Sequence, residues 1–336
     1  MPELRQDLVR GNWVLIATDT ALKPRDFPMH KNGVKFSSTN NFCPFCEGNE
    51  AYTTSELASL RENGSLPDSP GWLIRTITNK YSGFRLEGEL RIIEDRIYQS
   101  CNGLGQHEVI IETPEHGVEF HHFSREKIGT VLQMLKERYN VLARDERVKY
   151  IQIYKNRGLL AGASLEHSHS QILALPMLPN SLRGIGDYYG KNRRCLLCDV
   201  LEEEKKEGKR IIKEEENFVV LCPYASRFPY ETWIIPRRHN AHFGDISQGE
   251  LISLSSILFA FLRVMVAYLN DPAYNMVIIS APLNTGDAAG YHWYLEIIPR
   301  LLINSGVEIT TGIYMNPVAP EIAAHMFRER MSKEPF

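Results

Sequence analysis

The chain has 336 residues, of which 43% are hydrophobic and 24% are charged, and its formal net charge is −3 at pH 7. This composition is typical of a globular protein of one large or two ordinary domains. The slightly negative charge argues against the basic surface that binding to DNA or RNA needs, so we expect no nucleic-acid partner.

The amino-terminal half should contain several strands and one helix, separated by loops rich in Gly, Pro and Ser. A Cys43-Pro-Phe-Cys46 motif follows the loop at 19–42. Ser124 is the expected cap of the helix, because apolar residues recur at helical spacing after it. Strands are expected at 12–18, 72–78, 89–98, 107–112 and 150–154.

The carboxy-terminal half repeats this plan after a polar linker at about 178–194. A capping box, Ser247-Gln-Gly-Glu250, should begin a helix at 248–269. Its apolar stretch is about long enough to cross a membrane, but Arg263 interrupts it and no basic segment flanks it, so we expect a buried helix and no membrane partner. Further elements are expected as strands at 218–222, 231–236, 276–279 and 291–298 and a helix at 319–331.

Matched spacings indicate that the two halves are tandem copies of one unit. In each half a CxxC motif comes first, and a His then stands eight residues before the helix cap. A second His follows that one after 51 residues in the first half and after 53 in the second. The amino-terminal copy carries an insertion within about 51–106, because its CxxC-to-His gap is longer.

Each copy therefore offers two Cys and two His, the ligand set of a closed tetrahedral zinc site. The first residues carry no apolar run of the kind found in secretory signals, so we expect a cytoplasmic protein whose cysteines bind metal and form no disulfides. Buried apolar cysteines are the alternative, and Cys101 and Cys222, which lack a partner, are expected in the core. We predict two zinc ions, held by Cys43, Cys46, His116 and His167 and by Cys195, Cys198, His239 and His292.

The segment His167-Ser-His-Ser-Gln171 is the strongest functional feature of the sequence. Alternate residues of a strand share a face, so His167, His169 and Gln171 should point the same way. If His167 binds zinc, His169 is free to attack phosphorus, and Gln171 can donate an N–H to a phosphoryl oxygen. Gly158 and Gly162 in the preceding turn let backbone N–H groups approach a phosphate. The second copy has one His in the corresponding strand, so we expect one reactive centre per chain.

The pattern Asn-x-Gly-x-x-x-Gly-x-Ser-x-x-His-x-His-x-Gln at 156–171 resembles the active-site signature of the galactose-1-phosphate uridylyltransferases, a branch of the histidine-triad superfamily. Together with the element pattern, the resemblance predicts an α+β fold built by tandem duplication of a histidine-triad-like unit. Its antiparallel sheets should join into one extended sheet with helices on one side. The expected domains are 1–178, which carries the reactive strand, and 190–336.

The resemblance implies a ping-pong reaction. The nucleophile His169 would take UMP from UDP-glucose and pass it to a hexose 1-phosphate such as galactose 1-phosphate. Members of the family are usually cytoplasmic homodimers. By the same match, catalytic roles fall to Gln171 and Ser164, and substrate contacts or support of the phosphate loop fall to Asn79, Asn156 and Gly162.

Several features are similar instead to the plant ADP-glucose phosphorylase branch, including Ser168 between the two His and the complete second CxxC. The family's arginine-bearing loop reads Thr20-Ala-Leu-Lys-Pro24, so Lys23 is the candidate to replace one arginine as a substrate contact. Two alternatives therefore stay open. One is an ADP-glucose or UDP-sugar phosphorylase with phosphate as acceptor, and the other is a non-catalytic module that binds zinc or a nucleotide.

Overall fold

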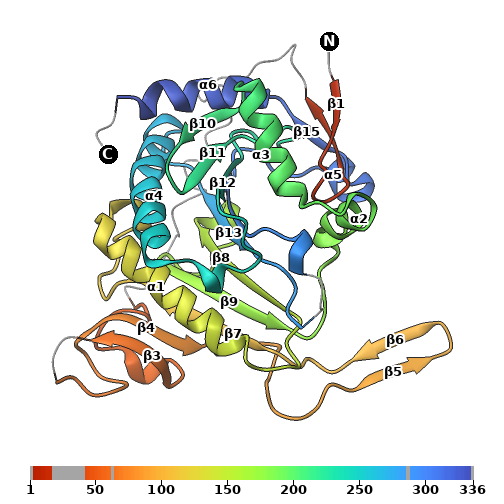
Figure 1. The fold of residues 1–336 in the computed structure, drawn as a ribbon. Helices are drawn as coiled ribbons and strands as arrows, with labels where there is room; N and C mark the ends of the chain where they lie inside the picture. The colour runs from red at the N-terminus through yellow and green to blue at the C-terminus, as the bar shows by residue number, and fades with distance from the viewer. Residues whose placement is uncertain (1–2, 17–41, 62–63, 285–287, 334–336) are drawn as a thin grey trace.

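The computed structural model describes residues 3–16, 42–61, 64–284 and 288–333. Its centre is one ten-stranded antiparallel sheet to which each copy contributes five strands (Figure 1). The copies meet where β8 pairs with β13, for example at Asn156 and Asn275. From one edge to the other the strands are β3 (Glu56–Arg61), β4 (Trp72–Thr78), β7 (Gln106–Ile111), β9 (His169–Leu175), β8 (Tyr150–Arg157), β13 (Tyr274–Ile279), β14 (Tyr294–Pro299), β12 (Thr232–Pro236), β11 (Phe218–Leu221) and β10 (Ile211–Glu214).

The order of the strands confirms the duplication, because each copy places its strands in the same sequence outward from the shared centre. The prediction that the two sheets join into one is therefore correct. The α+β architecture of two tandem units with antiparallel strands and packed helices is confirmed as well.

Three helices, α1 (Arg125–Leu142), α4 (Gln248–Tyr268) and α6 (Pro320–Met331), pack over one face of the sheet around the largest apolar core. The predicted caps are present. Ser124 Oγ accepts a hydrogen bond from the Lys127 N–H at 3.2 Å, and the capping box of Ser247 and Glu250 closes in both directions. α4 is the one helix of the described residues that is long and apolar enough to span a membrane. More than half of its apolar window is buried against α1, α6 and the sheet, so it is a core helix as predicted.

The prediction that helices cover one side only is wrong. The segment predicted as a linker contains α2 (Arg183–Asn192), and α3 (Leu196–Glu207) follows it. Both lie on the opposite face of the carboxy-terminal half (Figure 1). There Ile185, Leu197 and Leu201 pack against strand residues such as Val219 and Ile235. These strands alternate two apolar faces, so the second face also needs a cover.

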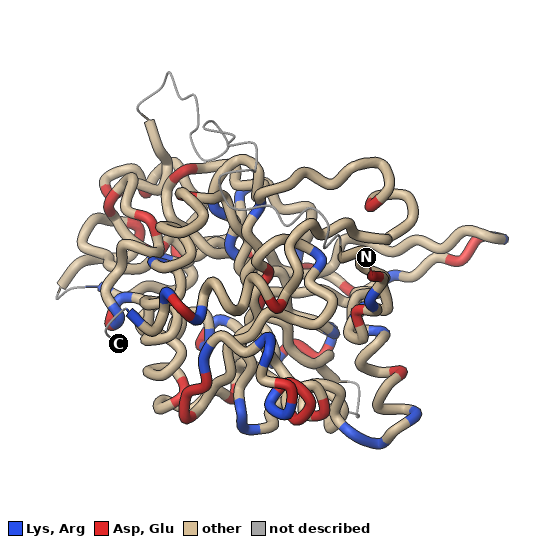
Figure 2. The backbone as a smooth tube through the Cα atoms, turned by 90° about the horizontal axis from the view of Figure 1, so that it is seen from above, with Lys and Arg blue, Asp and Glu red and all other residues tan. Residues whose placement is uncertain are grey.

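The remaining strands are small. β1 (Glu3–Gln6), β2 (Trp13–Ile16) and β15 (Tyr314–Asn316) form a three-stranded sheet, next to which lies the short helix α5 (Gly306–Thr311). The strand predicted at 89–98 is a hairpin of β5 (Ile92–Asp95) and β6 (Tyr98–Cys101), which extends away from the body of the molecule (Figures 1 and 2). Cys101 is exposed at its end, so the prediction of a core Cys101 is wrong, whereas Cys222 is buried.

Candidate active site

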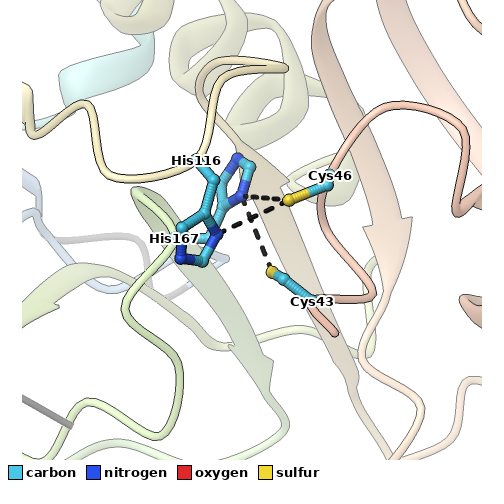
Figure 3. A group of neighbouring side chains, drawn as sticks. All are labelled: Cys43, Cys46, His116 and His167. Carbon is cyan, nitrogen blue, oxygen red and sulfur yellow. Dashed lines mark hydrogen bonds between the residues drawn. The ribbon is translucent and has the colours of Figure 1, made fainter. Parts of the chain in front are cut away.

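Four side chains from separate parts of the amino-terminal copy converge on one point (Figure 3). Cys46 Sγ lies 3.5 Å from Nδ1 of His116 and 3.7 Å from Nδ1 of His167, and Cys43 Sγ lies 3.7 Å from the latter atom. Tetrahedral zinc, with bonds of about 2.0–2.3 Å, separates a bound sulfur from a bound nitrogen by about 3.6 Å. The four side chains therefore fit a zinc ion.

The backbone fixes the ring of His167 for this role. Its Nε2 lies 2.7 Å from the Thr113 carbonyl oxygen, so Nε2 donates a proton there and Nδ1 presents its lone pair to the sulfurs. Burial lowers the pKa of His167 to about 4, which keeps the ring neutral near pH 7. Burial and the neighbouring Cys43 thiol raise the pKa of Cys46 to about 11, so metal binding must release this proton.

The carboxy-terminal copy forms the matching cluster from Cys195, Cys198, His239 and His292. Cys198 Sγ lies 3.3 Å from Nδ1 of His239 and 3.6 Å from Nδ1 of His292. These separations also fit zinc. Nε2 of His292 is buried without a hydrogen-bond partner among the described residues, so this site lacks the carbonyl support that His167 receives.

His169 is the first residue of strand β9 and stands two residues after His167 of the metal cluster. Its Nδ1 lies 2.7 Å from the His167 carbonyl oxygen and donates its proton there. Nε2 therefore carries the lone pair of the ring. Burial lowers the pKa of His169, and the ring of Phe45 packs edge-on against it with 5.4 Å between centroids. The result is a neutral, oriented imidazole, the form that attacks phosphorus.

His169 and Gln171 line a cavity of about 490 Å³. Ser164, predicted to be catalytic, and Asn79, predicted to contact the substrate, line it too, and Lys80 is the one charged side chain among the described residues that line it. The other lining residues are largely apolar or aromatic: Phe42, Pro44, Phe45, Tyr52, Thr53, Ile77, Tyr81, Val109 and Leu165. A cavity of this size and character suits a nucleotide with a sugar phosphate.

The loop between β8 and β9 has the predicted glycine geometry. Gly158 has φ 79° and Gly162 has φ 82°, a region in which other residues are strained. Asn156 accepts a hydrogen bond at 2.8 Å from the amide of Asn275, which also donates to the Ala161 carbonyl at 2.8 Å. Asn275 thereby ties the loop to the second copy. Lys23 lies outside the described residues.

Comparison with known proteins agrees with this geometry. The family described as galactose-1-phosphate uridyl transferase, N-terminal domain, matches residues 76–179, and the corresponding C-terminal domain matches residues 182–315. A relative named ADP-glucose phosphorylase, from Arabidopsis thaliana, is 36% identical and covers 98% of this chain and 93% of its own. The chain belongs to the galactose-1-phosphate uridylyltransferase family.

Other members of this family resemble the chain over its full length. A galactose-1-phosphate uridylyltransferase from Thermotoga maritima is 29% identical over 98% of both chains. The crystal structure of an ADP-glucose phosphorylase from Arabidopsis thaliana with bound ADP-glucose is 32% identical. It superposes with a TM-score of 0.79 over 98% of both chains. The family resemblance seen in the sequence is thus confirmed.

The second copy of this uridylyltransferase-family chain has no counterpart of the reactive His. The strand registers place Tyr294 and Glu296 of β14 where β9 has His169 and Gln171. The side chain of Arg10 lies against both residues. Its guanidinium is 2.7 Å from the Glu296 carboxylate and 3.4 Å from the Tyr294 hydroxyl. The prediction of one reactive centre per chain is consistent with this filled second position.

A buried ion pair supports the reactive strand from behind. Glu112 Oε2 accepts hydrogen bonds from Lys155 Nζ and from Ser168 Oγ, both at 2.6 Å, and Oε1 accepts one from Ser170 Oγ at 2.5 Å. Lys155 also donates to the His169 carbonyl at 3.1 Å. The two Ser residues that point away from the cavity thus fasten β9 on both sides of His169.

The sequence did not single out Glu112, Lys155 or Asn275, nor two neighbours of Gln171, His107 and Tyr154. Their positions depend on which strands are adjacent, and strand order is not visible in the sequence. The sequence did contain a weak signal for Glu112. It is a charged residue on a predicted strand, and alternation places it on the same face as the apolar Ile110. A buried charge on a strand needs a partner.

Proposed function

We propose that the protein is a nucleotidyltransferase that carries the nucleotidyl group of a nucleoside diphosphate sugar on Nε2 of His169. The observation that carries this proposal is the hydrogen bond from Nδ1 of His169 to the His167 carbonyl. It leaves a neutral imidazole with its free lone pair beside a cavity of nucleotide size. A non-catalytic zinc module would have no use for such a residue.

The proposed reaction has two steps that mirror each other. Nε2 of His169 attacks the α-phosphorus, an N–P bond forms, and the bond to the bridging oxygen breaks to release the sugar 1-phosphate. An oxygen of the acceptor then attacks the same phosphorus, and the N–P bond breaks to free the imidazole. We assign the amide of Gln171 to the phosphoryl oxygens and Ser164 to the departing phosphate. No base stands where Gln171 is, which favours transfer over hydrolysis.

We propose ADP-glucose as the donor and inorganic phosphate as the acceptor. This revises the expectation of UMP transfer to galactose 1-phosphate. Support comes from the 36% identical relative named ADP-glucose phosphorylase and from the similar crystal structure with bound ADP-glucose. The Ser168 between the two His and the complete second cluster agree with that branch. Uridylyl transfer to a hexose 1-phosphate is the second candidate, supported by the Thermotoga maritima relative.

Product analysis separates these two candidates. We expect ADP-glucose and phosphate to yield ADP and glucose 1-phosphate, with the reaction absent in His169→Ala. UDP-glucose and galactose 1-phosphate should react far more slowly. Faster turnover of the second pair would overturn the proposed donor and acceptor in favour of the second candidate, while leaving the role of His169 intact.

We further propose that zinc fills both Cys₂His₂ clusters and that its role is structural. Such an ion would cross-link the Cys43–Cys46 loop to the strand that carries His169 and so hold one wall of the cavity. We propose Asn79 and Lys23 as further substrate contacts, with Asn156 and Gly162 shaping the phosphate loop. A cytoplasmic homodimer with domains at 1–178 and 190–336 completes the proposal.

A further inference from the structure

The orientation of the Gln171 carboxamide decides whether it can act on a phosphoryl group. Its NH₂ end can donate to a phosphoryl oxygen, whereas its oxygen would repel one. The two ends have almost the same shape, so the side chain alone does not prefer either orientation. Something beside it must select the orientation in which NH₂ faces the reacting phosphate.

Two side chains on the flanking strands supply this selection. Gln171 of β9 lies between Tyr154 of β8, its register partner, and β7, which carries His107. Nε2 of His107 lies 2.8 Å from Oε1 of Gln171, and the Tyr154 hydroxyl lies 3.0 Å from the same oxygen. Both partners donate, so the oxygen is held on this side. The NH₂ group has no hydrogen-bond partner among the described residues, and Gln171 lines the cavity.

Asn79, which also contacts the His107 ring, determines which ring nitrogen of His107 carries the proton. If Nε2 donates to Gln171, Nδ1 must be an acceptor, and Nδ2 of Asn79 lies 3.3 Å from Nδ1. The same amide is 3.4 Å from Nε2, a longer contact that the protonated Nε2 cannot accept. Oδ1 of Asn79 accepts from the Tyr81 N–H at 2.9 Å, which leaves its NH₂ group as the donor. Burial lowers the pKa of His107 and keeps the ring neutral.

We propose that His107 and Tyr154 are positioning residues that hold the Gln171 amide toward the phosphoryl group during transfer to and from His169. Neither residue lines the cavity, so each acts through Gln171. His107 also connects Gln171 to Asn79, the proposed nucleotide contact, so one hydrogen-bonded chain runs from the nucleotide side of the cavity to the reacting phosphate. This inference rests on the proposed nucleotidyl transfer.

The test measures single-turnover nucleotidylation of His169 by ADP-glucose in Tyr154→Phe and His107→Phe. Tyr154→Phe removes one oxygen only and should fold normally. We expect the rate to fall about 100-fold in His107→Phe, the lower end of the range seen when one transition-state donor is lost, and about 10-fold in Tyr154→Phe, which leaves His107 to hold Gln171. The KM for ADP-glucose should change by less than about threefold, because the lost interaction belongs to the transition state. Tyr150→Phe is the matched control, because Tyr150 lies on the same strand opposite Leu175, does not line the cavity and makes no contact with Gln171, and it should react at the wild-type rate.

The decisive comparison repeats both substitutions in a Gln171→Ala background. If they act through Gln171, they should cause no further loss there, whereas a general structural effect would persist. Full additivity in that background, or wild-type rates in the single variants, would overturn the inference. An absence of any adduct in the wild-type protein would instead overturn the proposed nucleotidyl transfer, so the two failures are distinguishable.

Discussion

At the scale of single residues, Lys155 shows how a charge can be kept inside the protein behind the reactive strand. Its side chain is 2% exposed and that of Glu112 is 0% exposed, and Lys155 Nζ lies 2.6 Å from the carboxylate. Replacing Lys155 by Met leaves the Glu112 carboxylate buried without its counter-charge. Loss of one partner of a buried pair costs about 3–5 kcal/mol of the free energy of unfolding.

We therefore expect Lys155→Met to lower the free energy of unfolding by about this amount, measured by urea denaturation. Lys206→Met is the control, because Lys206 and Glu203 form an ion pair in which both side chains are more than 60% exposed. The control should change stability little. Equal effects of the two substitutions would contradict the account of the Glu112 network.

His121 makes the stability depend on pH. Burial, with contributions from Arg157 and His122, lowers the pKa of His121 to about 3 from 6.5. Below pH 6.5 the unfolded chain gains a proton on this residue and the folded chain does not, so stability falls as the pH drops from 6.5 toward 3. The contribution is at most about 1.4 kcal/mol per pH unit.

We expect His121→Gln to lose stability less steeply than the wild type between pH 6.5 and pH 4.5 in urea titrations. His325→Gln is the control, because the His325 side chain is 61% exposed on α6. It should keep the wild-type slope. If His121→Gln and the wild type showed the same slope, the buried neutral state of His121 would be wrong.

Individual site residues could be predicted from the sequence where their spacing along the chain identifies them. The two CxxC motifs and the repeated interval between the paired His residues together selected all eight members of the two clusters that the structure assembles. It failed for contacts that depend on neighbouring strands. Gln171 was recognised, but His107 and Tyr154 beside it were not, because their strands are adjacent to β9 only in the folded sheet.

At the scale of elements, each CxxC motif supplies two ligands of one cluster, Cys43 and Cys46 from a loop and Cys195 and Cys198 from the start of α3. We expect elemental analysis to find two zinc ions per chain in the wild type and about one in Cys46→Ser. Cys101→Ser is the control, because Cys101 is exposed and belongs to neither cluster. It should retain both ions. Full zinc content in Cys46→Ser would contradict the proposed ligand set.

The long elements were predictable because their signals are local. The caps at Ser124 and Ser247 located the starts of α1 and α4, and the range predicted for the second helix, 248–269, ends one residue beyond α4. The helix α2 was missed because its sequence, Arg183-Gly-Ile-Gly-Asp-Tyr-Tyr-Gly-Lys-Asn192, contains three glycines and reads as a loop. Packing of Ile185 against the second face of the sheet stabilises a helix that propensity alone disfavours.

At the scale of the whole molecule, the hairpin of β5 and β6 extends away from the body (Figure 1). All eight of its strand residues are exposed, and Ile97 in the turn and Tyr98 at the start of β6 are 87% and 70% exposed. An isolated two-stranded hairpin is marginally stable in water. We propose that a second copy of the chain covers it in the expected homodimer.

Light scattering after size exclusion tests this proposal. We expect the wild type to have twice the chain mass of 38.5 kDa, and Ile97→Asp to shift toward the monomer. Ile309→Asp is the control, because Ile309 is 74% exposed on the separate helix α5. A monomeric wild type, or a dimer unaffected by Ile97→Asp, would contradict a dimer built on the hairpin.

The charges of the whole molecule agree with a small-molecule substrate. Basic and acidic residues are interspersed along the chain (Figure 2), and their numbers nearly balance, with 38 Lys and Arg against 41 Asp and Glu. The presence of two copies could be predicted because the spacings of the CxxC motifs, His residues and helix caps match in the two halves. The order of the strands in the sheet could not be predicted from the sequence. Antiparallel strands joined by long connections can pair in several orders that bury the same residues.

The most direct test of the central claim is the intact mass of the protein after mixing with ADP-glucose, and separately with UDP-glucose, without an acceptor. The quench must be alkaline, because bonds between phosphorus and histidine break in acid. The account predicts a mass increase of one AMP with ADP-glucose, absent in His169→Ala. An adduct that persists in His169→Ala, or no adduct with either donor, would contradict covalent transfer through His169.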